Sequence, residues 1–141
     1  MTVVLGGQAG SEGKGKIAGY LAKEFGASVA NFMPNAGHTW VSDDGTVVMV
    51  QQLPQAVVNK EALLFISAGS AIEPDLLLDE ITKYGAHGRV IIHPRAMVIE
   101  ERHRQAEAKS LNRISSTLKG CGYALADKVR RDKHTKLARD L

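Results

Sequence analysis

Short apolar runs alternate along this chain with polar stretches and glycine-rich turns. The run at residues 2–5 is rich in β-branched side chains and predicts a strand, which the glycines of residues 6–10 end. Apolar side chains then recur every fourth residue, which predicts a helix over residues 14–25 that stops at Gly26. Residues 28–33 predict a second strand. This order of strand, glycine loop, helix and strand favours a parallel sheet with a right-handed crossover.

The rest of the chain continues this alternation. Asp43-Asp44-Gly45 is a turn sequence between apolar residues and predicts a β-hairpin. Pro74 suits the first turn of a helix, where its missing N–H needs no partner. The pattern further predicts hairpin strands at 40–41 and 46–50, strands at 63–67 and 89–93, helices at 74–84, 98–112 and 124–131, and a loop at 115–122. We therefore expect an α/β fold. It is a doubly wound, mostly parallel sheet with a phosphate-binding loop after its first strand, and residues 1–141 form a single nucleotide-binding domain.

Composition excludes several classes of protein. Of the 141 residues, 44% are hydrophobic and 23% are charged, as in a globular protein rather than a disordered one. No apolar run approaches the ~20 residues that span a bilayer, and the first residues lack the features of a secretory signal. Cys121 is the single cysteine, so we expect a reducing, cytoplasmic setting and read this thiol as a bystander.

Charge is distributed unevenly. Residues 1–100 carry seven Lys or Arg against ten Asp or Glu, a net of −3, whereas residues 101–141 carry eleven against five, a net of +6. A basic segment can attract nucleic acid, a membrane surface or a small anion. Aromatic residues make up only 5% of the chain, so stacking surfaces for nucleic acid are few. We therefore expect small phosphorylated ligands and neither membrane nor direct nucleic-acid binding.

A glycine-rich loop, Gly10-Ser-Glu-Gly-Lys-Gly-Lys16, opens the first predicted helix. Glycines let backbone N–H groups gather around an anion, and a helix N-terminus adds positive potential. The spacing is that of a phosphate loop, but Ile17 stands where Ser or Thr would bind magnesium. The alternative is a structural turn with solvated lysines. Because such a turn would not require Lys14 and Lys16, phosphate binding is favoured.

Two further stretches carry polar groups suited to phosphate chemistry. Asn35-Ala-Gly-His-Thr39 follows the second predicted strand, and loops at the carboxyl ends of parallel strands converge on one crevice. That rule predicts that His38 lies close to the glycine loop. There it is either an acid or hydrogen-bond donor, or a turn residue that caps backbone groups. Ser115-Ser-Thr117, with Lys119 and Gly120, is either a second phosphate cradle or a solvated loop. His93, His103 and His134 have no metal-ligand spacing, and we interpret them as structural or exposed.

These motifs resemble those of one enzyme family. Gly7-Gln-Ala-Gly-Ser-Glu-Gly-Lys-Gly-Lys16 is similar to the adenylosuccinate synthetase signature G-x-Q-W-G-D-E-G-K-G-K, and Asn35–Thr39 matches that family's second motif in full. Ile114-Ser-Ser-Thr-Leu-Lys-Gly with Asp127-Lys-Val-Arg-Arg131 is similar to its nucleotide-phosphate loop. The resemblance covers essentially the whole chain but only the N-terminal part of the family's catalytic domain.

The resemblance implies a carbon–nitrogen ligase. Members phosphorylate the 6-oxygen of a purine nucleotide with a nucleoside triphosphate and Mg²⁺, and the amine of L-aspartate then displaces the phosphate. By position, it implies catalytic roles for Ser11, Lys14 and His38, and metal contacts from Ser11 and the Gly37 carbonyl. Arg131 would reach the nucleotide phosphate bound by the other subunit of a homodimer. The full nucleotide- and phosphate-binding set it implies is Gly10, Ser11, Glu12, Gly13, Lys14, Gly15, Lys16, Asn35, Ala36, Gly37, His38, Thr39, Ser116, Thr117 and Arg131.

Ser11 departs from the family pattern, which has an aspartate there as the base for purine N1 and as a metal ligand. A serine leaves room for the 2-amino group of guanine, and in this the chain looks like the phage 2-aminoadenylosuccinate synthetase branch. That branch implies dGMP as substrate and ATP or dATP as donor, for the synthesis of diaminopurine DNA in the cytoplasm of a host cell. The alternatives are the ordinary reaction of IMP with GTP, a nucleotide-binding module without turnover, and a basic nucleic-acid-binding domain. Because family members are much longer, we expect parts of their active site to lie outside these residues.

Overall fold

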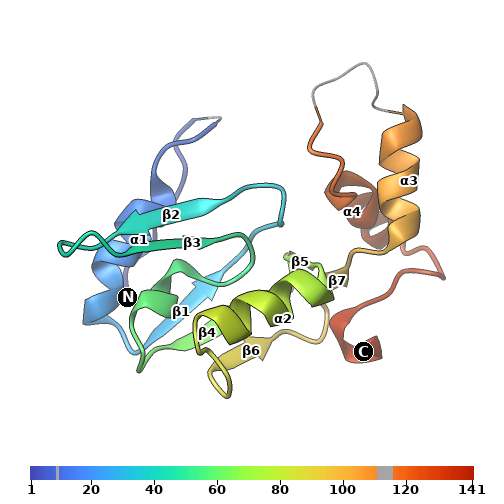
Figure 1. Cartoon of the computed structure of the whole chain (residues 1–141). Coiled ribbons are helices and arrows are strands. Elements are labelled where there is room, and N and C mark those ends of the chain that lie inside the picture. Colours follow the sequence, from blue (N-terminus) through green and yellow to red (C-terminus); the bar gives the residue numbers. More distant parts are fainter. Residues whose placement is uncertain (9, 111–115) are drawn as a thin grey trace.

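The centre of the fold is a small parallel sheet. The computed structural model describes residues 1–8, 10–110 and 116–141. In it β1 (Ala27–Ala30), β4 (Leu63–Ile66) and β6 (Val90–Ile92) lie side by side in the order β1-β4-β6 (Figure 1). Both pairings are parallel, with Ala27 opposite Leu63 and Leu64 opposite Val90. The predicted α/β fold with a mostly parallel sheet is confirmed.

A β-hairpin and the first helix pack on each other next to this sheet (Figure 1). β2 (His38–Val41) and β3 (Val47–Val50) pair antiparallel, and Gly45 supplies the left-handed φ of 83° that their turn requires. The helix α1 (Lys14–Leu21) continues into the 3-10 turn η1 (Ala22–Glu24) and packs on β2. A Cβ at Gly19 would lie 2.5 Å from the indole of Trp40, so the two elements meet at a glycine. Trp40 is therefore a packing residue between α1 and the hairpin.

The core beneath the hairpin is closed by α2 (Pro74–Lys83) and the 3-10 turn η2 (Gln55–Val58). Pro74 stands in the first turn of α2, as the sequence predicts. The buried carboxylate of Glu80 accepts the backbone N–H groups of residues 51, 52 and 53 at 2.6, 3.0 and 2.9 Å, which fixes the chain after β3. The largest fully buried apolar side chains of this cluster are Val50, Leu53, Val57, Leu64, Ile66 and Ile72.

A second apolar cluster joins the C-terminal third to the sheet. The short strands β5 (Ala71–Ile72) and β7 (Met97–Val98) pair in parallel, and α4 (Cys121–Arg130) packs on them. Helix α3 (Glu101–Ser110) packs along α4, and both lie at the end of the molecule away from α1 (Figure 1). The chain ends in the 3-10 turn η3 (Ala138–Asp140).

Several predicted boundaries are wrong. Residues 2–5 form no strand: Val3 and Leu5 are 63% and 81% exposed, and a cavity of ≈ 610 Å³ lies between the first residues, α1 and β1. Their β-branched composition sets a propensity, but no neighbouring strand supplies hydrogen bonds or burial there. The helix predicted at 98–112 begins at Glu101, because β7 takes the residues before it, and the end predicted at 112 lies outside the described residues. The loop predicted at 115–122 starts outside them too, and α4 already begins at Cys121.

Within the ranges that the structure describes, no helix has the length and hydrophobicity needed to cross a membrane.

Candidate functional site

The glycine-rich loop runs directly into α1. Gly10 and Gly13 have left-handed φ values of 105° and 77°, which a residue with a side chain adopts only with strain. Gly13 precedes the first residue of α1, and no side chain caps that end. The first N–H groups of the helix therefore keep their hydrogen-bonding capacity, and the end of the helix carries positive potential. Ala9, which the signature includes, lies outside the described residues.

The charged side chains of Glu12 and Lys14 are paired within this loop. The carboxylate of Glu12 accepts the backbone N–H groups of Gly7 and Gln8 at 2.7 and 2.8 Å, and it is paired with the ammonium group of Lys14. These donors hold the pKa of Glu12 below its usual value, with Lys14 as the largest cause. Lys16 and Ser11 are both exposed to solvent.

His38 lies against the start of α1. A Cβ at Gly15 would be 2.7 Å from the Cβ of His38, so only a glycine permits this approach, and the prediction that His38 lies close to the loop is confirmed. The imidazole is half-buried and meets Phe32 edge to face, with the ring centres 6.0 Å apart. Burial, and after it the charge of Lys14, lowers the pKa of His38 below 6.5. At neutral pH it is therefore an uncharged donor beside an ammonium group.

The turn before His38 connects this region with α4. Asn35, Ala36 and Gly37 are exposed, while Met33 packs against the second apolar cluster, which contains Cys121. The backbone N–H of Asn35 also interacts with the thiol of Cys121. Burial raises the pKa of that thiol to about 11, so Cys121 is protonated and inert, as expected of a bystander.

The carboxyl ends of the parallel strands meet next to this turn. After β1, the side-chain oxygen of Asn31 accepts a hydrogen bond from Ser67, 2.9 Å away, which follows β4. Lys128 of α4 donates to the backbone carbonyls of Ala68 and Arg95, the latter at 2.8 Å, and so ties α4 to the loops after β4 and β6. Burial is the main reason why the pKa of Lys128 is lowered. In the sequence Lys128 is one residue of the stretch Asp127-Lys-Val-Arg-Arg131, and no local pattern distinguishes it from Arg130.

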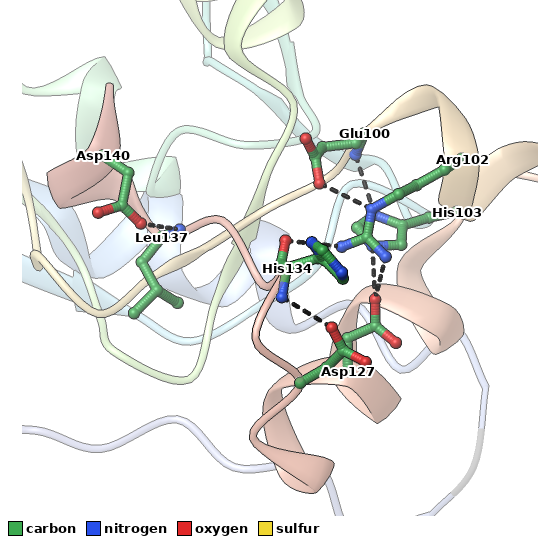
Figure 2. A network of polar contacts seen from close by, with 8 residues as sticks. Glu100, Arg102, His103, Asp127, His134, Leu137 and Asp140 are labelled. Carbon is green, nitrogen blue, oxygen red and sulfur yellow. Dashed lines mark hydrogen bonds and ion pairs between the residues drawn. The ribbon is translucent and has the colours of Figure 1, made fainter.

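A polar network holds α3 and α4 together (Figure 2). His103 is buried; its Nδ1 accepts the Glu100 N–H at 3.0 Å, so its Nε2 carries the hydrogen that is donated to Asp127 over 3.1 Å. The same carboxylate is paired with Arg102 at 2.6 Å, and Arg102 also donates to the His134 carbonyl at 3.1 Å. His103 is thus structural and His134 exposed, as predicted.

The loop before α4 carries the remaining predicted residues. The hydroxyl of Ser116 accepts the N–H of Leu118 at 3.2 Å, and Thr117 is exposed. The N–H of Gly120 donates to the buried carboxylate of Glu107 at 2.6 Å, which fixes the start of α4. Ser115 lies outside the described residues. Arg131 ends α4 in a left-handed conformation, with φ 55°, and is exposed.

The predicted residues therefore form two groups. Lys14, Gly15 and His38 are adjacent, and the turn at residues 35–37 joins them to α4. Thr117 belongs to the α3–α4 end, and among the described residues no hydrogen bond or ion pair joins it to Lys14 or His38. The first group combines an ammonium side chain with uncapped helix N–H groups, and the second offers hydroxyls.

No group of three or more His, Cys, Asp or Glu side chains within the described ranges could hold a metal ion. The donors that the sequence puts forward are the exposed hydroxyl of Ser11 and the exposed Gly37 carbonyl. Both are neutral hard oxygens, which suit Mg²⁺ as additions to water and substrate phosphates rather than as a complete site. They fit a Mg²⁺ ion that arrives with a nucleotide.

Three comparisons with known proteins match this chain to the same kind of enzyme. The family model described as adenylosuccinate synthetase matches residues 3–138. The chain is 38% identical to an adenylosuccinate synthetase of Methanococcus vannielii, over 99% of this chain and 43% of that protein. It is 40% identical to an N6-succino-2-amino-2'-deoxyadenylate synthase of Vibrio phage phiVC8, over 95% of this chain and 42% of that protein.

A solved structure gives the same result in three dimensions. The succinoaminodeoxyadenylate synthetase of cyanophage S-2L, bound to dGMP and to dATP as an energy donor, superposes with a TM-score of 0.79 at 35% identity. The superposition covers 94% of this chain and 39% of that one. The chain thus spans about two fifths of the length of the relatives that it matches.

Proposed function

Because this chain belongs to the adenylosuccinate synthetase family, we propose that it carries the phosphate-binding part of a ligase. That ligase joins L-aspartate to carbon 6 of a purine nucleotide at the expense of a nucleoside triphosphate. The observation that carries the proposal is the contact of His38 with the start of α1, beside Lys14. A neutral donor, an ammonium group and free helix N–H groups at one place are the groups that phosphoryl transfer needs.

Each residue then has a role that its chemistry permits. Phosphate oxygens of the donor would accept hydrogen bonds from the backbone of Gly13 and Gly15 and from Lys14 and Lys16. His38 would donate to the phosphoryl group as it moves to the 6-oxygen of the purine. When bound, Mg²⁺ would neutralise charge on the phosphates, and the Ser11 hydroxyl and the Gly37 carbonyl would help to hold it. The other residues of this set, Gly10, Asn35, Ala36 and Thr39, would shape the two loops.

The second group of residues would hold the purine nucleotide by its 5′-phosphate. Ser116 and Thr117 supply hydroxyls before α4, and the α3–α4 network keeps that helix in place. The exposed guanidinium of Arg131 would reach the nucleotide of a second subunit in a homodimer. We propose that residues 1–141 work as one nucleotide-binding unit, in the cytoplasm, or in the host cytoplasm if a phage encodes it.

The preferred nucleotide in this proposal is dGMP, with ATP or dATP as donor. Ser11 is small and uncharged, which leaves space for a 2-amino group next to purine N1. The likeness to the cyanophage enzyme bound to dGMP and dATP supports this choice. The second candidate is the reaction of IMP with GTP, which the likeness to the adenylosuccinate synthetase of Methanococcus vannielii favours.

Calorimetric titration of dGMP, IMP, ATP and GTP into the purified chain tests these alternatives. We expect dGMP to bind more tightly than IMP, and Ser11→Asp to weaken dGMP binding, because the larger anion takes the space of the 2-amino group. Tighter binding of dGMP by Ser11→Asp would contradict the steric argument. Phosphate release from ATP that needs both dGMP and aspartate would support the ligase, whereas binding without release would support a nucleotide-binding module.

A further inference from the structure

Glu12 is bound by donors of the kind that a phosphate group needs, and one of them, Lys14, is a donor that the proposed function assigns to phosphate. Its Oε1 accepts two consecutive backbone N–H groups, those of Gly7 and Gln8, and its Oε2 is paired with Lys14. Two amides and an ammonium group around one anion are the usual elements of a phosphate site. In this structure the anion is a side chain of the loop itself.

The loop covers most of the Glu12 side chain, whereas its partner Lys14 is more exposed. The side chain of Glu12 is only 13% exposed, against 40% for Lys14. Gly6 closes one side: a Cβ there would lie 2.5 Å from Oε2 of Glu12 and 3.0 Å from Nζ of Lys14. A glycine at position 6 is therefore needed for the carboxylate to sit where it does.

We propose that the Glu12 carboxylate is an internal anion that fills the phosphate position of the loop in the empty protein and leaves when nucleotide phosphate binds. The inference rests on the proposed function, in which this loop binds phosphate. One N–H group cannot donate fully to two acceptors, and two anions next to each other repel. The incoming group has more charge and more acceptor oxygens than a carboxylate, so it can displace the side chain into solvent.

This exchange has two consequences. While the site is empty, Glu12 keeps Gly7, Gln8 and Lys14 in place, so that the donors are gathered before the nucleotide arrives. Because Lys14 lowers the pKa of Glu12, the carboxylate is ionised at neutral pH and competes with every phosphate that binds. Glu12 would therefore reduce affinity for phosphate, which is the opposite of a contribution to binding.

Glu12→Gln tests the exchange, with Glu24→Gln as matched control. Glutamine keeps an acceptor for the two amides but has no charge. Glu24, in the turn after α1, is exposed, and its replacement changes the net charge of the chain by the same amount. Pyrophosphate is the probe, because it has adjacent phosphates and no base, and calorimetry gives its affinity.

We expect Glu12→Gln to bind pyrophosphate about three- to tenfold more tightly than the wild type, since a charged hydrogen bond is roughly twice as strong as a neutral one, and Glu24→Gln to match the wild type. Glu12→Ala, which removes the acceptor, should also bind at least as tightly as the wild type. In ¹⁵N-resolved NMR spectra, the Gly7 and Gln8 amide signals of the wild type should move when pyrophosphate is added.

Equal or weaker binding by both Glu12 variants, with the wild type still binding, would overturn the exchange alone and leave the phosphate site intact. An equal gain in Glu24→Gln would overturn it as well, because the effect would then be one of net charge. If none of the proteins binds pyrophosphate or nucleotide, the proposed function fails, and the exchange fails with it.

Discussion

Gly15→Ala is the substitution that connects the fold most directly with the site. Gly15 is the second residue of α1, and the Cβ added there would lie 2.7 Å from Cβ and 3.3 Å from both Cα and Cγ of His38. Because the Cβ and Cα of His38 belong to or adjoin the backbone of β2, they cannot rotate out of the way. Either α1 moves away from β2, or His38 moves away from Lys14.

Two opposing effects determine how much Gly15→Ala changes the free energy of unfolding. Alanine is favoured over glycine in a helix by up to about 1 kcal/mol, and less in its first turn. Overpacking a close contact costs about 1–3 kcal/mol. We therefore expect Gly15→Ala to lower the free energy of unfolding by about 1–2 kcal/mol. The control is Gly26→Ala: nothing lies within 4 Å of a Cβ there, so the free energy of unfolding should stay the same or rise by about 0.4–1 kcal/mol.

Urea denaturation followed by the fluorescence of Trp40 gives both free energies of unfolding. Trp40 is the single tryptophan of the chain and contacts α1 through Gly19. In the same samples, the imidazole NMR signals of His38 report whether its surroundings change. A Gly15→Ala protein as stable as the wild type, with unshifted His38 signals, would refute the contact between α1 and β2 on which the site depends.

Three further predictions concern charges around the site. Asp127→Asn should lower the free energy of unfolding at pH 7 by about 1–2 kcal/mol, since a charged acceptor of two donors becomes neutral; the exposed Asp132→Asn should not. Although burial raises it, hydrogen bonds hold the pKa of Asp127 below 3.8 overall. The stability that ionised Asp127 contributes is therefore present above its unfolded-state pKa and is lost as pH falls through its lowered folded-state pKa. Urea titrations should show the free energies of unfolding of the wild type and Asp127→Asn converging below about pH 4; a difference between them that does not change with pH would contradict this. NMR titration of His38 should give a pKa below 6.5 that Lys14→Gln raises; because the unfolded imidazole protonates first, stability should fall as pH drops below about 6.5. Lys128→Met should lower the free energy of unfolding by about 1–3 kcal/mol, because two strand-end carbonyls lose their donor, and an unchanged urea midpoint would count against that link.

The sequence was most informative where one local rule decides the structure. The parallel strands, the hairpin at Gly45 and the start of α2 at Pro74 follow from apolar runs and turn chemistry. The approach of His38 to the glycine loop was predicted from a topological rule for loops that follow parallel strands. Residues 2–5 form no strand, however, and it is the packing of α1 on β2 that brings the two segments together.

Features that depend on distant partners could not be predicted. Residues 2–5 have strand propensity, yet whether a strand forms depends on a neighbour that a local pattern does not specify. The two-residue strands β5 and β7 are too short to have a pattern. Motif position did not predict the hydrogen bonds of Glu12 either, because its side chain accepts backbone N–H groups four and five residues earlier in the same loop.

The central claim is that the loop before α1, with Lys14, binds phosphate. Titration of pyrophosphate into ¹⁵N-labelled protein tests it residue by residue, with Lys14→Gln as comparison. We predict that the backbone signals of Gly13, Lys14 and Gly15 shift most, and that Lys14→Gln weakens binding about tenfold or more through loss of a charged hydrogen bond. Shifts confined to the basic residues of 101–141, with equal affinity in Lys14→Gln, would contradict the account.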